Sequence, residues 1–256
     1  MKTLFITGAT RNTGFATARL FAKNGYNIAL SSRNADDALE TSRKLRDEFG
    51  VTAKGYALDL SDTENINDVF SQAEKDFGTI DAFVANSANL GLGFGTLNTN
   101  EDDFDSIVVP NIKGTFFCCQ TAAKIMKKHG GGSIVTIGSI QGTGAIHGRC
   151  IYSMSKAAIS ALVKNMAFEL GEYNIRANNI IAGAIHSSRW NSLSEEEIAK
   201  RRSRYPIGRE STEEEIANAV FYLCSDLSAS ITGTDLTIDS GISVCILPYS
   251  KEGEMI

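Results

Sequence analysis

TLFITGATRNTG, residues 3–14, is the stretch that decides the fold. Its first five residues, 3–7, form an apolar, β-branched run that is typical of a buried strand. A loop containing Gly8 and Gly14 follows directly, and the amphipathic segment 15–25 then predicts a helix that a glycine ends. Glycines at such a turn allow positive φ angles and a close approach of phosphate groups, and the helix N-terminus offers unpaired N–H groups. A strand, a glycine loop and a helix in this order predict a dinucleotide-binding unit.

Outward from this unit, the chain alternates short apolar runs with longer amphipathic segments. Crossover helices longer than about 10 residues join parallel strands, and strands that are apolar on both faces need helices on both sides. We therefore predict one doubly wound, Rossmann-like α/β domain over residues 1–256, with about seven parallel strands and helices on both faces. Beyond the first unit, strands are expected at 27–32, 51–59, 80–86, 131–138, 174–181 and 234–239, and helices at 34–49, 61–77, 101–128, 152–173 and 212–224.

Composition and charge exclude several classes of protein. Of the 256 residues, 43% are hydrophobic and 21% are charged, so the chain is neither disordered nor collagen-like. The net charge of -5 and the lack of a long basic run argue against binding to nucleic acid. Its apolar stretches fall far short of the roughly 20 residues that a membrane helix needs.

Cysteine usage bears on the cellular compartment and on metal binding. The five cysteines are odd in number and form no Cys-x-x-Cys pair or metal-ligand spacing. Reduced, mostly buried thiols are typical of cytosolic proteins. We therefore expect a cytoplasmic protein that holds no metal and has neither a nucleic acid nor a membrane as partner.

The residues after the second predicted strand bear on the choice of cofactor. In dinucleotide folds, an acidic residue about 20 positions beyond the glycine loop usually holds the ribose 2′-hydroxyl of NAD(H). This chain has Ser32 and Arg33 there, and a guanidinium can donate two charge-assisted bonds to a 2′-phosphate. Arg11, in the glycine loop, can approach the same phosphate, although both arginines are also compatible with a plain solvated surface. We therefore predict NADP(H), with NAD(H) the less favoured cofactor.

Tyr152 and Lys156 form a candidate catalytic pair. They are four residues apart on a predicted helix and so share one face, although this spacing also occurs on ordinary solvated helices. A nearby ammonium favours the phenolate and lowers a tyrosine pKa, which is normally about 10, so that the phenol can exchange a proton with a carbonyl or an alcohol. Ser139 ends the predicted fifth strand, at the sheet edge where ligands bind in this fold class.

Taken together, these motifs resemble those of the classical short-chain dehydrogenase/reductase family, over nearly the whole chain. The thirteen-residue step from Ser139 to Tyr152 also matches the spacing of that family. Each motif is weak alone, but their order is specific. The matching motifs are TGATRNTG at 7–14, Asp59-Leu60, Asn86-Ser87-Ala88, Asn111-Ile112-Lys113-Gly114, Ser139, Tyr152-Ser153-Met154-Ser155-Lys156 and Asp239-Ser240-Gly241.

The resemblance implies roles for individual residues. Tyr152 is expected to be the general acid/base, and Ser139 is expected to orient and polarise the substrate oxygen. Lys156 is expected to bond the nicotinamide ribose and lower the pKa of Tyr152, while Asn111 holds a water molecule in a proton relay. The residues expected to line the cofactor are Gly8, Arg11, Asn12, Gly14, Ser32, Arg33, Asp59, Leu60, Asn86, Tyr152, Lys156, Ile185 and Ser187.

Some positions depart from the family pattern. Asn12 replaces the middle glycine of the loop; asparagine tolerates such a turn, and its side chain can reach a phosphate or cap the helix. Pro110, inside the predicted helix 101–128, removes one N–H and disturbs the carbonyl of Ser106, so we expect a kink that keeps the catalytic asparagine in place. Ala182 replaces a proline, which predicts a more mobile loop after the sixth strand. Residues 86–89 match a family motif that usually reads Asn-Asn-Ala-Gly. In this chain Ser87 and Asn89 replace its second and fourth residues.

Substrate-side residues are expected beside the catalytic pair and in a lid segment over approximately residues 186–210. His147 and His186 are candidate acids or substrate clamps, but a loop histidine without a second partner is more often incidental. Trp190 is either a packed anchor of the lid or an apolar wall for the substrate. The basic run 201–204 is either a solvated helix face or a contact for an anionic carrier or coenzyme. The candidate substrate residues are Gln141, His147, Arg149, His186 and Trp190.

These observations predict an NADP(H)-dependent oxidoreductase that interconverts a ketone and a secondary alcohol by hydride transfer. Its small-molecule substrate is left open between a 3-oxoacyl thioester and a hydroxysteroid, sugar or polyol. The alternative is a non-catalytic NADP(H)-binding regulatory protein on the same fold, against which the complete catalytic set argues. Apolar surface on helices 101–128 and 152–173, including Phe116, Phe117 and Cys118, predicts a homo-oligomer, either a tetramer or a dimer.

Overall fold

Residues 1–245 are described in the computed structural model, except for the side chains of residues 188 and 189. They form one seven-stranded parallel sheet in the order β3-β2-β1-β4-β5-β6-β7, so the predicted doubly wound fold is confirmed. The order of the strands reverses between β1 and β4. The strands are β1 (Thr3–Thr7), β2 (Asn27–Ser32), β3 (Ala53–Ala57), β4 (Ala82–Ala85), β5 (Gly132–Ser139), β6 (Ile175–Ala182) and β7 (Asp235–Ile238).

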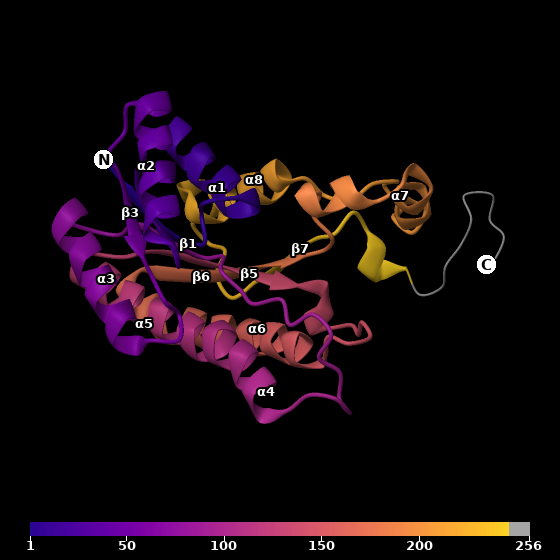
Figure 1. Cartoon of the computed structure of the whole chain (residues 1–256). Helices are drawn as coiled ribbons and strands as arrows, with labels where there is room; N and C mark the ends of the chain where they lie inside the picture. The colour runs from indigo at the N-terminus through magenta and orange to yellow at the C-terminus, as the bar shows by residue number, and fades with distance from the viewer. Residues whose placement is uncertain (246–256) are drawn as a thin grey trace.

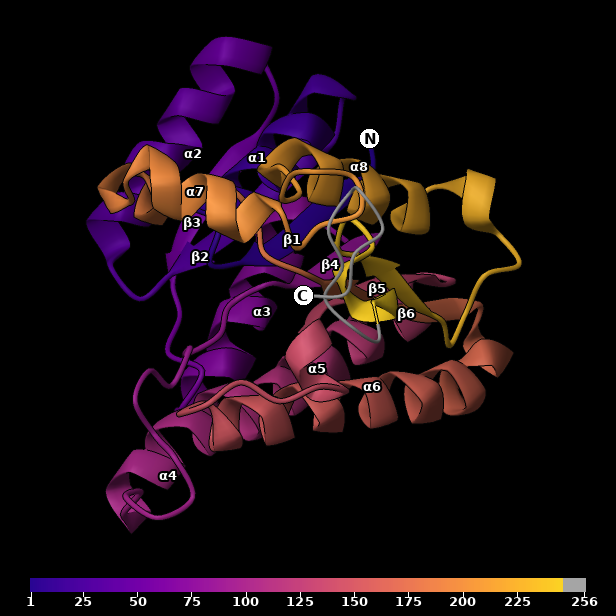
Figure 2. The ribbon, with the colours of Figure 1, turned by 90° about the vertical axis from the view of Figure 1, so that its right-hand side faces the viewer.

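Helices cover both faces of this sheet (Figure 1). One face carries α1, α2 and α8, and the other carries α3, α5 and α6. The short helix α4 lies against α6, while α7 lies on the same side of the sheet as α1 and α8, as a second view shows (Figure 2). The helices are α1 (Asn12–Lys23), α2 (Ala35–Phe49), α3 (Thr63–Phe77), α4 (Glu101–Val108), α5 (Thr115–Lys128), α6 (Cys150–Leu170), α7 (Glu195–Arg202) and α8 (Glu213–Cys224).

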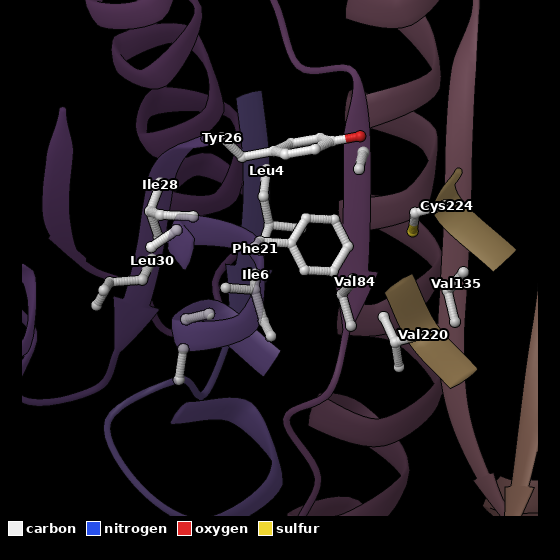
Figure 3. Close-up of a cluster of buried hydrophobic side chains, with 14 of the residues drawn as sticks. Leu4, Ile6, Phe21, Tyr26, Ile28, Leu30, Val84, Val135, Val220 and Cys224 are labelled. Atoms are coloured by element: carbon white, nitrogen blue, oxygen red, sulfur yellow. The ribbon is translucent and has the colours of Figure 1, made fainter. Parts of the chain in front are cut away.

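The core consists of two apolar layers, one on each face of the sheet. Because side chains alternate along a strand, Leu4 and Ile6 of β1 point to one face, where they join Phe21 of α1 (Figure 3). Phe5 points to the other face and stacks on Phe70 of α3, with 4.2 Å between ring centres. This two-sided burial explains why β1 is apolar at consecutive positions.

Local signals set the boundaries of several helices. The side chain of Asn34 accepts hydrogen bonds from the backbone N–H groups of Asp36 and Asp37 at the start of α2. Asp62 caps α3 in the same way, and α2 stops at Gly50, which has a φ of 68°. Except in the two segments described next, each predicted strand or helix begins and ends within three residues of the observed one.

Two segments differ from the sequence-based expectation. The predicted helix 101–128 is divided into α4, a π-helical turn (Val109–Gly114) and α5, so the irregularity expected at Pro110 takes the form of a widened turn. The segment 186–210, in which no helix was predicted, contains a 3₁₀ turn (Ser188–Ser192) and the helix α7. α7 begins with a capping box and has few apolar residues, so its periodicity was too weak to predict a helix.

Candidate active site

A cavity of about 1420 Å³ opens along the carboxyl ends of the strands. Its lining includes Gly8 after β1, Ser32 at the end of β2, Asn86 after β4, Ser139 at the end of β5 and Gly183 after β6. In open α/β sheets, ligands bind in such a crevice because neighbouring loops diverge where the strand order reverses. Every residue that the sequence placed at the cofactor lines this one cavity.

The glycine loop packs tightly against the loop that follows β4. A Cβ atom on Gly8, whose φ is 65°, would lie 2.4 Å from the Oγ of Ser87. A Cβ on Gly14 would lie 2.2 Å from the carbonyl oxygen of Gly8. The side-chain amide of Asn86 donates to the carbonyls of Thr7 and Gly8 at 3.0 Å each. Larger residues therefore have no room at either glycine, and the loop is held in one shape.

The first turn of α1 presents free N–H groups to the cavity. Arg11 is at its N-cap position, and no side chain caps the helix, in contrast to α2 and α3. Asn12 adopts a left-handed φ of 50°, as the family's glycine position requires, but it does not cap α1, so one of its two suggested roles is not observed. Uncapped N–H groups and the positive end of the helix dipole fit the pyrophosphate of a dinucleotide.

Two exposed arginines line the end of the cavity next to β2. The guanidinium groups of Arg11 and Arg33 form no hydrogen bond or ion pair with any residue in the described part of the chain. The Oγ of Ser32 accepts a hydrogen bond from the N–H of Asn34 at 3.3 Å. Asp37, in the first turn of α2, also lines the cavity and was missed in the sequence because it lies beyond the usual acidic position. Arg11, Arg33 and the carboxylate of Asp37 therefore line this end of the cavity.

Tyr152 and Lys156 are one turn apart near the start of α6 and both line the cavity. Both are buried, and the Lys156 Nζ lies 5.6 Å from the centre of the Tyr152 ring. The guanidinium of Arg149 lies 5.9 Å from the same ring. The Nζ also donates to the carbonyl oxygen of Ile137 at 2.6 Å. Burial lowers the pKa of Lys156 to about 8.

Ser139 and Asn111 occupy different positions relative to the cavity. Ser139 lines it, is nearly buried, and accepts a hydrogen bond at its Oγ from the N–H of Gln141 at 3.2 Å. Asn111 lies in the π-helical turn behind the wall, and only 2% of its surface is exposed. Its Nδ2 donates to the carbonyl of Asn89 at 2.8 Å and to the Oγ of Ser155 at 3.1 Å. The side chain of Asn111 thus links the loop after β4 to α6.

Three of the five candidate substrate residues line the cavity, namely Gln141, Arg149 and Trp190. An Nη atom of Arg149 donates to the carbonyl oxygen of Leu90 at 2.6 Å, which fixes this side chain at the rim. His147 is exposed and does not line the cavity; its neighbour in the same loop, Ile146, does.

His186, which also does not line the cavity, belongs to a charged cluster in the lid segment. Its Nδ1 lies 2.7 Å from the Oε1 of Glu210, and Arg202 donates two hydrogen bonds to the same carboxylate at 2.7 and 2.9 Å. Glu210 is buried, and the hydrogen bonds from Arg202 lower its pKa to about 2. Glu210 could not be identified from the sequence, because its partners are 8 and 24 residues away.

The side chain of Trp190, in the segment 186–210, is buried. Only 6% of its surface is exposed, and its ring lies 5.7 Å from that of His186 and 5.5 Å from the guanidinium carbon of Arg201. Trp190 is therefore a packed anchor that also contributes to the cavity wall, and Arg201 lines the same cavity.

The sequence of this chain is similar to those of known proteins over nearly its whole length. The family described as "Enoyl-(Acyl carrier protein) reductase" matches residues 8–243. A 3alpha-hydroxysteroid dehydrogenase of Mediterraneibacter gnavus is 34% identical over 241 residues, covering 93% of this chain and 95% of that protein. The chain belongs to the short-chain dehydrogenase/reductase family. Members of this family are oxidoreductases of alcohol and carbonyl groups that use a nicotinamide cofactor, so this protein is an enzyme rather than the regulatory alternative.

Other relatives of this short-chain dehydrogenase/reductase have varied substrates. A 3-oxoacyl-[acyl-carrier-protein] reductase of Aquifex aeolicus is 31% identical, covering 94% of this chain and 97% of that protein. A solved NAD+-bound xylitol dehydrogenase superimposes with a TM-score of 0.87 at 28% identity, covering 94% of this chain and 98% of that one. Steroid, acyl and polyol enzymes are thus similar to this chain to nearly the same degree.

Membrane-spanning and metal-binding features were also sought. Over residues 1–245, no helix combines the length and the apolar character needed to cross a bilayer. Within the same range, no three His, Cys, Asp or Glu side chains gather in a way that could hold a metal ion. The cysteines at 118, 119, 150, 224 and 245 are free thiols.

The burial of Lys156 has a measurable effect on stability. Its charged form is disfavoured in the folded state, so the free energy of unfolding contains a penalty of up to about 3 kcal/mol below pH 8, which disappears as the pH rises from about 8 to 10.5. Lys156→Met, which replaces the ammonium with an apolar, unbranched side chain one atom shorter, should therefore raise the free energy of unfolding by about 1–3 kcal/mol at pH 7, measured by urea unfolding without cofactor. The gain should vanish above pH 10.5.

Lys164, exposed on the same helix, provides the control for this measurement. Its contact with Asp235, at 3.5 Å, is an exposed ion pair, so Lys164→Met should change the free energy of unfolding by less than about 1 kcal/mol. A Lys156→Met variant that is less stable than the wild type at pH 7 would show that burial of the ammonium is not a net cost.

Proposed function

We propose that this enzyme is an NADP(H)-dependent reductase/dehydrogenase that interconverts a ketone and a secondary alcohol, with Tyr152 as the general acid/base. The observation that carries the proposal is that the uncapped first turn of α1, two unpaired arginines and the Tyr152–Lys156 pair all line one cavity. A site for phosphates and a site for proton transfer are thereby joined in a space large enough for a dinucleotide and a substrate.

The proposed roles follow from where each group lies. The bound nicotinamide supplies or accepts the hydride. In the direction of reduction, the phenol of Tyr152 donates a proton to the carbonyl oxygen, and the Ser139 hydroxyl donates a hydrogen bond to that oxygen. The ammonium of Lys156, 5.6 Å from the Tyr152 ring centre, stabilises the phenolate that this proton transfer leaves. Asn111 supports this arrangement from behind the wall.

The walls of the cavity favour an apolar substrate. Leu92 and Ile146 line it with 64% and 52% of their surfaces exposed, and Phe94 and Trp190 line it as well. Apolar side chains exposed around a binding cavity gain free energy when an apolar ligand covers them. A ketose, which presents hydroxyl groups, would leave this surface poorly matched. We therefore infer a ketone on a steroid ring or an acyl chain rather than a sugar.

A substrate panel tests this proposal. Steroid ketones, acetoacetyl thioesters, diketones and ketoses should be offered with NADPH and with NADH, and kcat/KM should be at least about tenfold higher for the steroid or acyl ketones. A Leu92→Ser and Ile146→Ser double variant should raise KM for these substrates. Leu97→Ser is the matched control, because Leu97 is fully exposed in the same loop and does not line the cavity. Preference for a ketose would contradict the substrate class, and no turnover of any ketone would contradict the function.

The lid segment and the assembly state complete the proposal. Glu210 joins the start of the segment, at His186, to α7 at Arg202, so we propose that residues 186–210 act as one unit over the cavity. We also propose a cytoplasmic homo-oligomer, a tetramer or a dimer, associating through α5 and α6. Exposed Phe116 on α5 and Phe168 on α6 support such an interface, but Cys118, expected at it, is instead buried in the core.

A further inference from the structure

A proline in the π-helical turn leaves the end of α4 without one of its regular hydrogen bonds. In an α-helix, the N–H of residue 110 would donate to the carbonyl of Ser106, but Pro110 has no N–H. The side chain of Asn89 lies against this carbonyl, and its Nδ2 donates to the Ser106 oxygen at 3.0 Å. The amide of Asn89 thus supplies the donor that the proline lacks.

The backbone of Asn89 holds the side chain of Asn111 from the other side. The N–H of Asn89 donates to the Oδ1 of Asn111 at 2.7 Å, and the carbonyl of Asn89 accepts from the Asn111 Nδ2 at 2.8 Å. Both polar atoms of the Asn111 side chain are therefore bonded to one residue. Because Asn89 is in the loop after β4, any shift of this loop moves the partners of Asn111.

The same network continues into the helix that carries the catalytic pair. The Asn111 Nδ2 also donates to the Oγ of Ser155, which is fully buried on α6. The Oγ of Ser155 in turn donates to the carbonyl oxygen of Tyr152 at 2.8 Å. A continuous chain of hydrogen bonds therefore runs from Ser106 through Asn89 and Asn111 to the backbone of Tyr152.

We propose that Asn89 is a positioning residue for the reaction, and that its side chain compensates for Pro110 in fixing the turn around Asn111. The inference rests on the proposed function. Asn89 and Pro110 both depart from the family pattern, they are far apart in sequence, and the structure joins them through one carbonyl. Loss of the Asn89 amide leaves the Ser106 carbonyl without this donor and releases the loop that holds Asn111. With an N–H restored at position 110, the carbonyl no longer depends on Asn89.

A double-mutant cycle tests this dependence. Asn89→Ala should lower kcat about tenfold while the Kd for NADPH, measured by fluorescence, changes less than about twofold. Pro110→Ala alone should have little effect on kcat. In the Pro110→Ala background, Asn89→Ala should cost no more than about threefold in kcat, because the new N–H can donate to Ser106. Asn98→Ala is the control, since Asn98 bonds only within the same loop and does not line the cavity.

The midpoint of urea unfolding, measured for every variant, separates positioning from folding. A merely structural role would lower this midpoint and leave kcat of the folded enzyme unchanged, which would overturn the proposal. Asn89→Ala could also lower kcat equally in the wild type and in the Pro110→Ala variant. This result would overturn the positioning role, and turnover by the wild type would leave the proposed function intact. Absence of turnover in the wild type would reject the proposed function, and the positioning role with it.

Discussion

Tyr152→Phe is expected to lower kcat by about a hundred- to ten-thousandfold, since general acid/base catalysis contributes a factor of this size. The substitution removes only the hydroxyl, and the buried ring keeps its place in the first turn of α6. The Kd for NADPH should change by less than about threefold, because the substitution leaves the glycine loop and the two arginines proposed to bind the phosphates untouched. Single-turnover oxidation of NADPH with the preferred ketone is the measurement.

A second tyrosine, in the turn that follows α6, provides the control. Tyr173 follows the end of α6, and its ring contacts the ammonium of Lys127 at 3.6 Å, a contact that phenylalanine preserves. Tyr173→Phe should therefore leave both kcat and KM unchanged. A Tyr152→Phe enzyme with near-normal turnover would show that the proton comes from elsewhere, and the Ser139 hydroxyl would then be the next candidate.

Features encoded by neighbouring residues were predictable from the sequence. Tyr152 and Lys156 share a helix face because they are four residues apart, and the segment that forms α6 is a long run without glycine or proline. Gly8 and Gly14 indicate the turn because few other residues tolerate its backbone and its close contacts. The doubly wound sheet follows from the same reasoning, because alternating strands and long helices leave few topologies open.

Features that depend on distant residues were not predictable from the sequence. Glu210 pairs with His186 and Arg202 only because the lid segment folds back on itself. Asn89 and Pro110 each look like an isolated departure from the family pattern until the fold places them on one carbonyl. No local spacing relates the two residues, because 20 residues that include the helix α4 separate Asn89 from Pro110 in the chain.

Cofactor preference depends on charges at the end of the cavity next to β2. The solved xylitol dehydrogenase binds NAD+, whereas a similar mannitol dehydrogenase is described as NADP-dependent, so the local side chains must decide. Arg33 and Arg11 have no protein partner in the described residues, and each charge-assisted bond to a 2′-phosphate contributes about 1.5–3 kcal/mol. The wild type should therefore prefer NADPH to NADH in kcat/KM by about ten- to several-hundredfold. Asp37, at the same end, opposes this preference.

A double variant should reverse the preference. Arg33→Ala removes one cation, and Ser32→Asp places a carboxylate at the position that accepts a ribose hydroxyl in NAD-dependent dinucleotide folds. With Asp37 already present, two carboxylates would then face the 2′-phosphate, so repulsion joins the loss of attraction. The ratio of kcat/KM for NADPH to that for NADH should fall by at least about a hundredfold.

Fixed ionic strength is essential to this comparison, because salt screens exposed phosphate–arginine pairs with a Debye length of about 8 Å at physiological salt. Arg43→Ala is the control, since Arg43 is an exposed cation on α2 that does not line the cavity, and its loss tests for a general effect of net charge. An unchanged ratio in the double variant, or equal use of both cofactors by the wild type, would mean that Arg33 is a surface residue without a ligand. A ratio that falls only when Arg11→Ala is added would instead place the phosphate against the glycine loop, because Arg11 is then its stronger partner.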